Sequence, residues 1–362
     1  MPLRKATWFR RAKAALTPGE GARSGAEGGW GASRSNHAAK RNPKTRERAM
    51  QIGFVMDPIA SVNINADTTF AFMLAAQERG HEVYFLKMED LAAEGDEAWG
   101  IMQHCQVRRV AGDHYELDSP QYEPLHALDA IFMRKDPPFD VPYLHAAHML
   151  ELAEEKGCFV INKPNGLRAA NEKLYALHFA ELIPDTVVTR SAERIHGFLD
   201  DHEGRCIIKP IDGHGGEGIF VLERDDKNLN ALIEVATDHE RKKIICQSYI
   251  PEIREGDKRI LMLDGEPLGG ILRVPAETEH RGNIHVGGTV KKVELTERDR
   301  EICEKVGERL RQDGIWFAGI DVIGEFLTEV NVTSPTGIQE MSRLNGVDGA
   351  GDVIGFIEGR VA

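Results

Sequence analysis

Short hydrophobic runs bounded by polar residues recur along the chain from residue 50 onward. Such runs, rich in β-branched and aromatic residues, are typical of buried strands. They occur at 52–56, 83–86, 130–133 and 158–161. Helical patterns separate them, and the order strand, helix, strand predicts parallel pairing. We therefore expect an open α/β domain over residues 50–170.

Two helices are expected in this domain. Asp67 precedes an apolar helical pattern from Phe70 to Ala76, and Gly80 follows it. Aspartate is favoured at the N-cap of a helix, and glycine is favoured just past its C-terminus. A second helical stretch covers about 141–156. The turn after the first strand lacks a GxGxxG pattern, so no dinucleotide site is predicted there.

Residues 171–250 alternate again between helical and strand-like patterns, which predicts a small α+β layer. The expected strands are 186–189, 205–209, 219–222 and 244–247. The expected helices are about 171–182, a second that ends near 202, and a third near 228–239.

Two hairpins and a helix are predicted in residues 251–362. Asp264-Gly265 separates two strand-like runs, which is a strong hairpin signal. Thr296, with Asp299 three residues later, predicts a helix N-terminus, and Gly314 predicts its end. A second pair of strand-like runs flanks a short glycine-containing turn within residues 319–335.

The second hairpin carries candidate metal ligands. Side chains alternate between the faces of a strand, so Glu329 and Asn331 point the same way. If the loop is 324–326, Asp321 lies opposite Glu329, with the Cβ atoms about 5 Å apart. Two carboxylates and a carboxamide at that spacing suit Mg²⁺ held between protein and phosphate oxygens, and the alternative is that these acidic side chains are simply solvated. A two-residue loop would instead pair Asp321 with Thr328 and turn Glu329 to the other face.

A glycine-rich loop is the second candidate site. Four glycines in six residues follow Lys209. Glycines let backbone N–H groups approach an anion without obstruction by Cβ, and the lysine adds a charge for phosphate. No GK[ST] follows, so this is not a Walker A loop, and a plain glycine-rich hairpin is the alternative. Lys173 is a further candidate, although a lone lysine on a helix is usually a solvated surface group.

Three arginines lie on the first hairpin and on the loop after it. Arg259, Arg273 and Arg281 could hold carboxylates or neutralise a transferring phosphoryl group, and the alternative is that each is a surface charge. The loop from Val274 to Thr289 is rich in glycine and poor in apolar residues. It is either a mobile lid or a long surface loop.

Composition excludes several classes of protein. The 362 residues carry a formal net charge of -13, which argues against nucleic acid as a partner, and no apolar run approaches the ~20 residues of a membrane helix. Five dispersed cysteines predict free thiols of a reducing compartment. Asn331-Val332-Thr333 fits the N-glycosylation pattern, which matters only in a secreted chain.

The segment 1–49 differs from the rest of the chain. It holds 12 Lys and Arg against 3 Glu and shows no sustained periodicity. An organelle-targeting peptide would also be basic and poor in acidic residues. We expect disorder, or an extension preceding a natural start at Met50, because strand-like sequence begins immediately after that methionine.

Taken together, these segments resemble the prokaryotic-type glutathione synthetases of the ATP-grasp superfamily. The resemblance runs in order from Met50 to about residue 345. It is carried by Val55-Met56-Asp57-Pro58-Ile59, Met133 to Asp140 (MRKDPPFD), Asn162-Lys163-Pro164, Asn171-Glu172-Lys173-Leu174, the 209–216 loop, Gly256-Asp257-Lys258-Arg259, Arg281-Gly282-Asn283 and Thr328 to Thr336. The MRKDPPFD run is quite specific to this family, whereas the lysines and metal ligands are general to ATP-grasp enzymes.

The resemblance implies an N-terminal α/β domain over 50–170, a central ATP-grasp lid over 171–250 and a C-terminal subdomain over 251–362. It implies that ATP contacts Lys173, Lys209, Asp212, Gly213, Gly215, Gly216, Gln247, Ser248, Tyr249, Ile250 and Asp257. It places Mg²⁺, or Mn²⁺, on Asp321, Glu329 and Asn331. It assigns the peptide substrate to Arg259, Arg273, Arg281 and Asn283, with Arg259 and Arg281 also catalytic. Ser248 and Thr289 depart from the expected Asn and Arg.

The implied reaction joins γ-glutamylcysteine to glycine with ATP, through an acyl phosphate, giving glutathione, ADP and phosphate. The alternatives are another ATP-grasp carboxylate–amine ligase and a non-catalytic nucleotide-binding regulator of the same fold. We expect a cytoplasmic homo-oligomer that binds small molecules and neither nucleic acid nor membrane.

Overall fold

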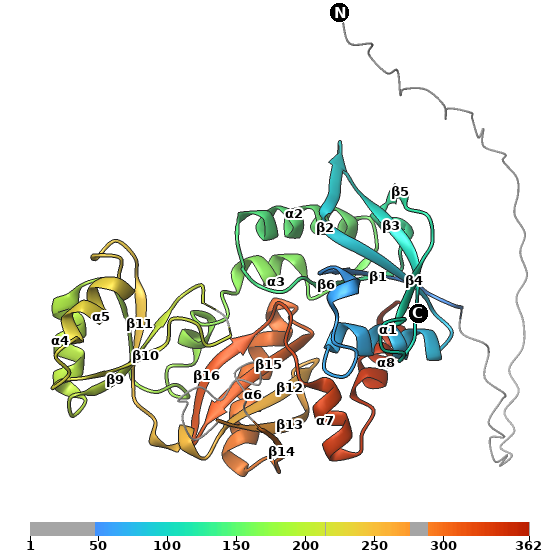
Figure 1. Cartoon of the computed structure of the whole chain (residues 1–362). Coiled ribbons are helices and arrows are strands. Elements are labelled where there is room, and N and C mark those ends of the chain that lie inside the picture. The colour runs from blue at the N-terminus through green and yellow to red at the C-terminus, as the bar shows by residue number, and fades with distance from the viewer. Residues whose placement is uncertain (1–47, 214, 276–288, 362) are drawn as a thin grey trace, which may run out of the picture. The chain divides into compact units, whose positions relative to one another are not determined.

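The computed structural model describes residues 48–213, 215–275 and 289–361, and three β-sheets organise this part of the chain (Figure 1). Most of the segment 1–49 and the loop residues 276–288 lie outside it. The first sheet has the order β4-β3-β2-β1-β6-β7, with β5 also paired to β3. Its strands are β1 (Gln51–Met56), β2 (Glu82–Glu94), β3 (Glu97–Val107), β4 (Tyr115–Leu117), β5 (Gln121–Pro124), β6 (Ala130–Arg134) and β7 (Phe159–Ile161).

The predicted parallel pairing is confirmed for β1 with β2 and β6, and for β6 with β7. The antiparallel strands β3, β4 and β5 extend the sheet beyond this parallel part. Of the two long strands β2 and β3, the sequence predicted only residues 83–86. Charged residues interrupt their apolar pattern, and the register shifts between Leu86 and Leu91, so no regular alternation marks the two strands.

Helices α1 (Thr68–Glu78), α2 (Val141–Glu155) and α3 (Pro164–Ala169) and the 3-10 turns η1 (Ile59–Ser61) and η2 (Leu125–Ala127) complete this region. The predicted N-cap is confirmed, because the Asp67 carboxylate accepts a hydrogen bond from the Phe70 N–H at 2.7 Å. Gly80 follows α1 with a φ of 88°, a backbone conformation that favours glycine.

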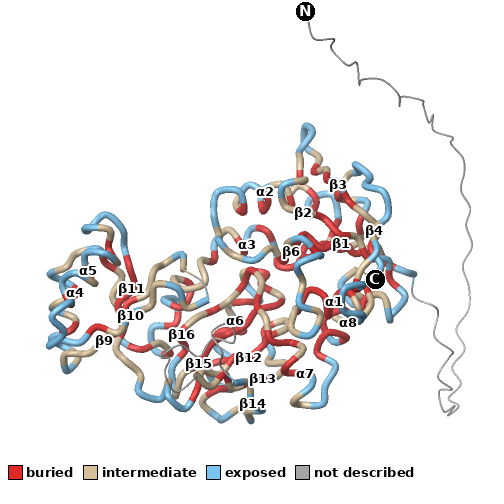
Figure 2. The backbone as a smooth tube through the Cα atoms, in the orientation of Figure 1, coloured by how far each residue is buried: buried red, intermediate tan, exposed pale blue. Residues whose placement is uncertain are grey.

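The second sheet is antiparallel throughout and has the order β10-β9-β11-β8. It contains β8 (Thr186–Thr189), β9 (Arg205–Pro210), β10 (Phe220–Glu223) and β11 (Ile244–Ser248). Helices α4 (Ala192–Asp201) and α5 (Leu229–Ala236) pack on it around their own small core, with their outer faces exposed (Figure 2).

The α-helix predicted over 171–182 is wrong. Only a 3-10 turn, η3 (Tyr175–Phe179), forms there. The Asn171 side chain accepts hydrogen bonds from the N–H groups of Lys173 and Leu174, at 3.2 and 3.0 Å. Such a local side-chain turn competes with helix formation.

The third sheet has the order β14-β13-β12-β15-β16. Its strands are β12 (Asp257–Leu263), β13 (Glu266–Val274), β14 (Thr289–Lys292), β15 (Phe317–Ile323) and β16 (Phe326–Asn331), and the turn η4 (Pro251–Arg254) precedes them. The Asp264-Gly265 turn is confirmed. Helix α6 (Glu297–Asp313) has the predicted capping box between Thr296 and Asp299, and left-handed Gly314 ends it.

The chain then returns to the first sheet through α7 (Ile338–Asn345) and α8 (Gly349–Val361). Ile354 and Ile357 of α8 are buried in the same hydrophobic core as Phe70 and Phe72 of α1. Glu358 accepts hydrogen bonds from Arg79 and lies 2.8 Å from the His81 ring. The end of the segment 251–362 therefore packs against the N-terminal domain.

All five cysteines are free and buried, which confirms the prediction of scattered thiols. None of the described helices combines the length and apolar character needed to cross a bilayer.

Candidate functional site

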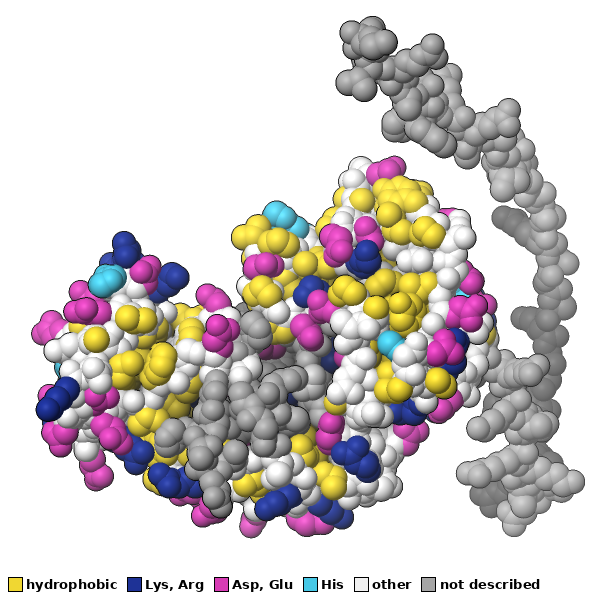
Figure 3. All heavy atoms as spheres, viewed as in Figure 1, with side chains coloured by type: hydrophobic (Ala, Val, Ile, Leu, Met, Phe, Trp, Pro, Cys, Tyr) yellow, Lys and Arg dark blue, Asp and Glu magenta, His cyan; other side chains and the backbone are white. Residues whose placement is uncertain are grey.

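A cavity of about 800 Å³ is lined by residues from all three sheets. The first sheet contributes Arg134, the second contributes Lys209 and the third contributes Asp321 and Glu329. The face seen in Figure 3 is hollowed between the part that carries α4 and α5 and the part that carries α2. The three sheets therefore bring cationic and anionic side chains from distant parts of the sequence into one cavity.

The register of the β15–β16 hairpin combines the two predicted alternatives. Ile323 pairs with Phe326, so the turn has two residues, Gly324 and Glu325. A bulge at Thr328 then shifts the register by one residue. Asp321 consequently pairs with Glu329, as a longer loop would have required. The two carboxylates share the cavity face that the metal hypothesis needs.

The Asp321 carboxylate is held by cations. Arg259 donates from Nε to Oδ1 at 2.5 Å and from Nη2 to Oδ2 at 3.0 Å, and Arg273 Nη2 lies 3.0 Å from Oδ2. Asn331 Nδ2 also donates to Oδ2, at 3.2 Å. Burial alone would raise the pKa of Asp321, but the two arginines outweigh it and hold the pKa well below its usual range.

Asp257 shares Arg273 with Asp321, because Arg273 Nη2 donates to Asp257 Oδ2 as well. Burial raises the pKa of Asp257 to about 7, against the opposing charge of Arg273. The second oxygen of Asp257, Oδ1, is buried and has no hydrogen-bond partner among the described residues. This oxygen can accept a hydrogen bond from a hydroxyl group in the cavity.

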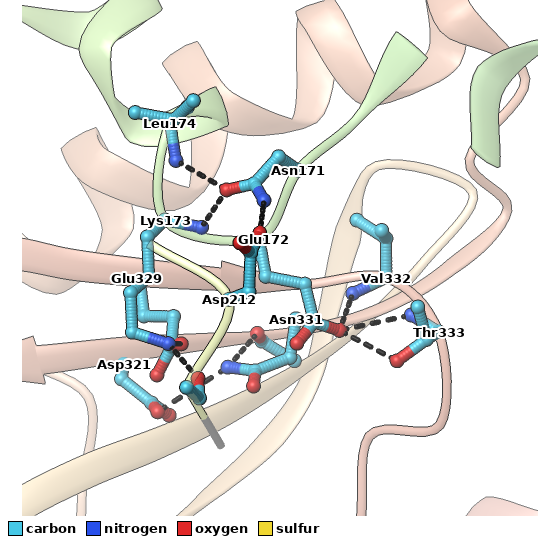
Figure 4. A network of polar contacts seen from close by, with 12 residues as sticks. Asn171, Glu172, Lys173, Leu174, Asp212, Asp321, Glu329, Asn331, Val332 and Thr333 are labelled. Atoms are coloured by element: carbon cyan, nitrogen blue, oxygen red, sulfur yellow. Dashed lines mark hydrogen bonds and ion pairs between the residues drawn. The ribbon is translucent and has the colours of Figure 1, made fainter. Parts of the chain in front are cut away.

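Two lysines face the hairpin from the opposite side of the cavity. Lys173 Nζ lies 3.0 Å from Glu329 Oε1 and also donates to the Gly213 carbonyl, so it bridges the glycine-rich loop and the hairpin (Figure 4). Lys209 points into the cavity from β9. Burial lowers the pKa of Lys209, Glu329 opposes this effect, and Lys173 adds to it. A phosphate group would add negative charge beside both ammonium groups, of which only Lys173 pairs with a carboxylate among the described residues.

Residues 247–250, at the end of β11 and just after it, form one wall of the cavity. The Gln247 side chain donates to Thr186 Oγ1 at 2.9 Å, and the Ser248 N–H donates to the Asp185 carbonyl at 3.0 Å. These bonds fix the strand against β8. Ile207, Val221 and Ile323 add apolar surface nearby, which suits a planar heterocycle.

The structure brings most of the candidate residues together. The following line the cavity: Lys173, Lys209, Gly213, Gly215, Gly216, Gln247, Ser248, Tyr249, Ile250, Asp257, Arg259, Arg273, Asp321, Glu329 and Asn331. Asp212 does not line it and instead accepts a 3.5 Å hydrogen bond from Asn171. Arg281 and Asn283 lie outside the described residues.

Sequence reasoning missed Arg134 as a site residue. Its guanidinium is buried, donates to Thr69 Oγ1 at 3.1 Å and to the Pro335 carbonyl at 2.9 Å, and forms no ion pair with any described residue. Its Nη1 has no partner there either. Burial lowers the pKa of Arg134, although Asp67 and Asp136 oppose the shift. The MRKDPPFD run was the available signal, but it served only as evidence of family.

The metal hypothesis fits the donors that are present. Among the residues that the structure describes, no three His, Cys, Asp or Glu side chains gather to form a metal cage. Mg²⁺ is usually held by one or two carboxylates together with substrate phosphates and water, so a full protein cage is not required. Asp321 and Glu329 supply that number of carboxylates, and Asn331 supplies a carboxamide oxygen.

Comparison with known proteins places the chain among its relatives. Residues 50–168 match the family described as prokaryotic glutathione synthetase, N-terminal domain, and residues 172–346 match prokaryotic glutathione synthetase, ATP-grasp domain. The chain is 45% identical over 321 residues to the glutathione synthetase of Synechococcus elongatus, which covers 86% of this chain and 99% of that protein. It is 48% identical over 303 residues to that of Gloeobacter violaceus, which covers 82% and 93%.

Among solved structures, the ATP-grasp ligase PsnB complexed with a minimal precursor, Mg and ADP superposes with a TM-score of 0.56 at 15% identity. The match covers 86% of this chain and 98% of PsnB. At this identity the likeness shows the fold alone, and it confirms the predicted ATP-grasp architecture.

Proposed function

The chain belongs to the prokaryotic glutathione synthetase family, and we propose that its cavity joins γ-glutamylcysteine to glycine at the expense of ATP. Membership makes the chain an ATP-dependent ligase of glutathione synthesis. The observation that carries the assignment of this activity to the cavity is its charge pattern. Lys173 and Lys209 face the hairpin carboxylates Asp321 and Glu329 across a space lined by all three sheets.

The proposed reaction has two steps. A carboxylate oxygen of the peptide attacks the γ-phosphorus of ATP, and the bond to ADP breaks, which leaves an acyl phosphate. The glycine amine then attacks the acyl carbon, phosphate leaves, and the amine loses a proton. The nucleophiles belong to the substrates, so the protein supplies position and charge.

Each wall of the cavity has a role in this proposal. Lys173, Lys209 and the backbone of the glycine-rich loop hold the phosphates of ATP, and residues 247–250 hold the adenine. The unpartnered Oδ1 of Asp257 accepts a hydrogen bond from a ribose hydroxyl. Arg259 and Arg273 neutralise charge that develops as the phosphoryl group moves.

Asp321, Glu329 and Asn331 are the residues that would hold Mg²⁺ or Mn²⁺. The metal, when bound, supplies positive charge to the phosphate oxygens. Arg259, Arg273 and Lys173 already neutralise the two carboxylates in the protein alone. Their release to the nucleotide phosphates would free carboxylate oxygens for the metal.

Arg134 is proposed to bind a carboxylate of the peptide. It lines the cavity from the first sheet, and its Nη1 is buried without a partner among the described residues. A buried cation is costly unless an anion accompanies it. From the resemblance, Arg281 and Asn283 stay proposed contacts to the substrate. The cytoplasmic location and the homo-oligomeric state also stay proposals.

The test is phosphate release from Mg-ATP with γ-glutamylcysteine and glycine omitted in turn. We expect release to require both. Release that ignores γ-glutamylcysteine would overturn the assignment and favour another carboxylate–amine ligase. ATP binding without turnover on any carboxylate would favour a regulatory nucleotide-binding protein.

A further inference from the structure

The side chain of Glu172 forms hydrogen bonds to the residues that directly follow strand β16. One oxygen, Oε1, accepts three hydrogen bonds: from the Val332 N–H at 3.0 Å, the Thr333 N–H at 3.1 Å and the Thr333 hydroxyl at 2.7 Å (Figure 4). Val332 and Thr333 are both buried. The contact joins residues that lie 160 and 161 positions apart in the sequence.

The backbone of Glu172 also forms a hydrogen bond to β16, two residues before Val332. Its carbonyl accepts a hydrogen bond from the Val330 N–H at 3.1 Å. Glu172 therefore binds β16 on both sides of Asn331, which donates to Asp321 Oδ2 at 3.2 Å. The position of Asn331 relative to Asp321 depends on where this strand end is fixed.

The residues next to Glu172 extend the contact to the glycine-rich loop. Lys173 donates to the Gly213 carbonyl and lies 3.0 Å from Glu329 Oε1. Asn171 holds the local turn through the N–H groups of Lys173 and Leu174, and it donates to Asp212 at 3.5 Å. Residues 171–173 thus touch both the phosphate-binding loop and the hairpin that carries the candidate metal ligands.

We infer that Glu172 is a positioning residue that sets the distance between the phosphate-binding lysine Lys173 and the metal-binding end of β16. The inference rests on the proposed function of the cavity. It requires Glu172 to act through the three hydrogen bonds that its side chain accepts. An electrostatic effect of its negative charge on the substrate is not part of this role. A carboxamide oxygen can accept the same three bonds, whereas a methyl group can accept none.

The experiment compares Glu172→Gln with Glu172→Ala in the full chain. The loss of all three hydrogen bonds in Glu172→Ala would leave the end of β16 unfixed, so we expect nucleotide–metal binding and kcat to fall by about 10- to 100-fold. We expect Glu172→Gln to stay within about threefold of the wild type, because the neutral acceptor keeps the geometry. Binding is measured by calorimetry with ADP and Mn²⁺, and turnover by phosphate release.

A second pair of variants tests the contact from the other side. Thr333→Val removes the hydroxyl donor without changing the shape of this buried residue, and Thr333→Ser keeps the donor. We expect Thr333→Val to lower the ADP–Mn²⁺ affinity several-fold more than Thr333→Ser, by about the effect of one hydrogen bond. All variants are compared at a temperature where circular dichroism shows them folded.

Two results would overturn the inference. Equal losses in Glu172→Gln and Glu172→Ala would mean that charge matters and not position. Unchanged ADP–Mn²⁺ affinity and kcat in a folded Glu172→Ala would mean that the contact is only structural. Failure of the proposed function gives a different result, because the wild type itself would then release no phosphate that depends on γ-glutamylcysteine, while the binding comparison could still be made.

Discussion

Arg259 holds Asp321 by two hydrogen bonds, from Nε to Oδ1 at 2.5 Å and from Nη2 to Oδ2 at 3.0 Å, and both side chains are buried. The pair joins adjacent strands, since Arg259 of β12 lies opposite Asp321 of β15. The same carboxylate is thus both a structural partner of two arginines and a candidate metal ligand.

Replacing this carboxylate should therefore affect stability as well as activity. Asp321→Asn leaves Arg259 and Arg273 without a full counter-charge, and breaking a buried pair costs roughly 3–5 kcal/mol. We expect a loss of that order in the free energy of unfolding, measured in urea, and at least a 100-fold loss of turnover with Mg-ATP, since metal charge contributes several kcal/mol to such reactions.

Asp299→Asn is the matched control. Asp299 is also buried and lies 2.6 Å from Lys258 Nζ, but it does not line the cavity. We expect it to lower stability while leaving the ADP–Mn²⁺ affinity near that of the wild type. Equal loss of metal affinity in both variants would show that the effect of Asp321→Asn is only a loss of fold.

Glu329→Gln should behave differently from Asp321→Asn. The Glu329 side chain is 24% exposed and pairs only with Lys173 among the described residues. Such a partly solvated pair contributes about 1 kcal/mol or less. We expect little change in the urea midpoint but loss of most metal-dependent turnover. Full turnover in Glu329→Gln would contradict the metal site.

Sequence reasoning predicted the second sheet and, except for β14, the third sheet, because local signals and packing agree there. The Asp264-Gly265 turn has positive φ at both residues, as a hairpin turn requires. The Thr296–Asp299 capping box and Gly314 mark both ends of α6. Local chemistry determines these features, so it can be read without knowing the tertiary structure.

The features that were missed depend on contacts between distant residues. The turn at Gly324-Glu325 has two residues, yet Asp321 still faces Glu329, because a bulge at Thr328 corrects the register. No pattern in the sequence marks that bulge. The side chains of Glu172 and Arg134 both have hydrogen-bond partners within residues 332–335, far along the chain. Similarly, α8 returns to α1 through contacts that periodicity does not encode.

Lys209 should make nucleotide binding depend on pH. Burial lowers the pKa of Lys209 in the free protein, and bound phosphate would favour the charged form and raise it again. Between those two pKa values, binding takes up a proton, so affinity for ADP falls as pH rises through that window. Calorimetry across that pH window in buffers of different ionisation enthalpy measures the uptake.

Lys209→Met should remove most of this proton uptake and weaken ADP binding. Lys242→Met is the control, because Lys242 is exposed and lies outside the cavity. Proton uptake that persists unchanged in Lys209→Met would assign the titration to another group.

Arg134 should govern the affinity for the peptide and not for the nucleotide. Its buried Nη1 is unpartnered among the described residues, and it lies on the first sheet, whereas the lysines proposed to bind phosphate lie in the segment 171–250. Removing a charge-assisted hydrogen bond of this kind costs about 1.5–3 kcal/mol, or 10- to 150-fold in affinity. We expect Arg134→Met to raise the KM for γ-glutamylcysteine by that factor while the affinity for ADP changes little.

Stability separates this role from a structural one. Arg134 has no ion-pair partner among the described residues, and its burial disfavours the charged form, so the folded protein carries a cost that bound carboxylate would relieve. The peptide should therefore raise the melting temperature of the wild type but not that of Arg134→Met. A variant that binds γ-glutamylcysteine normally but unfolds more easily would show instead that the bonds to Thr69 and Pro335 are the whole function of this arginine.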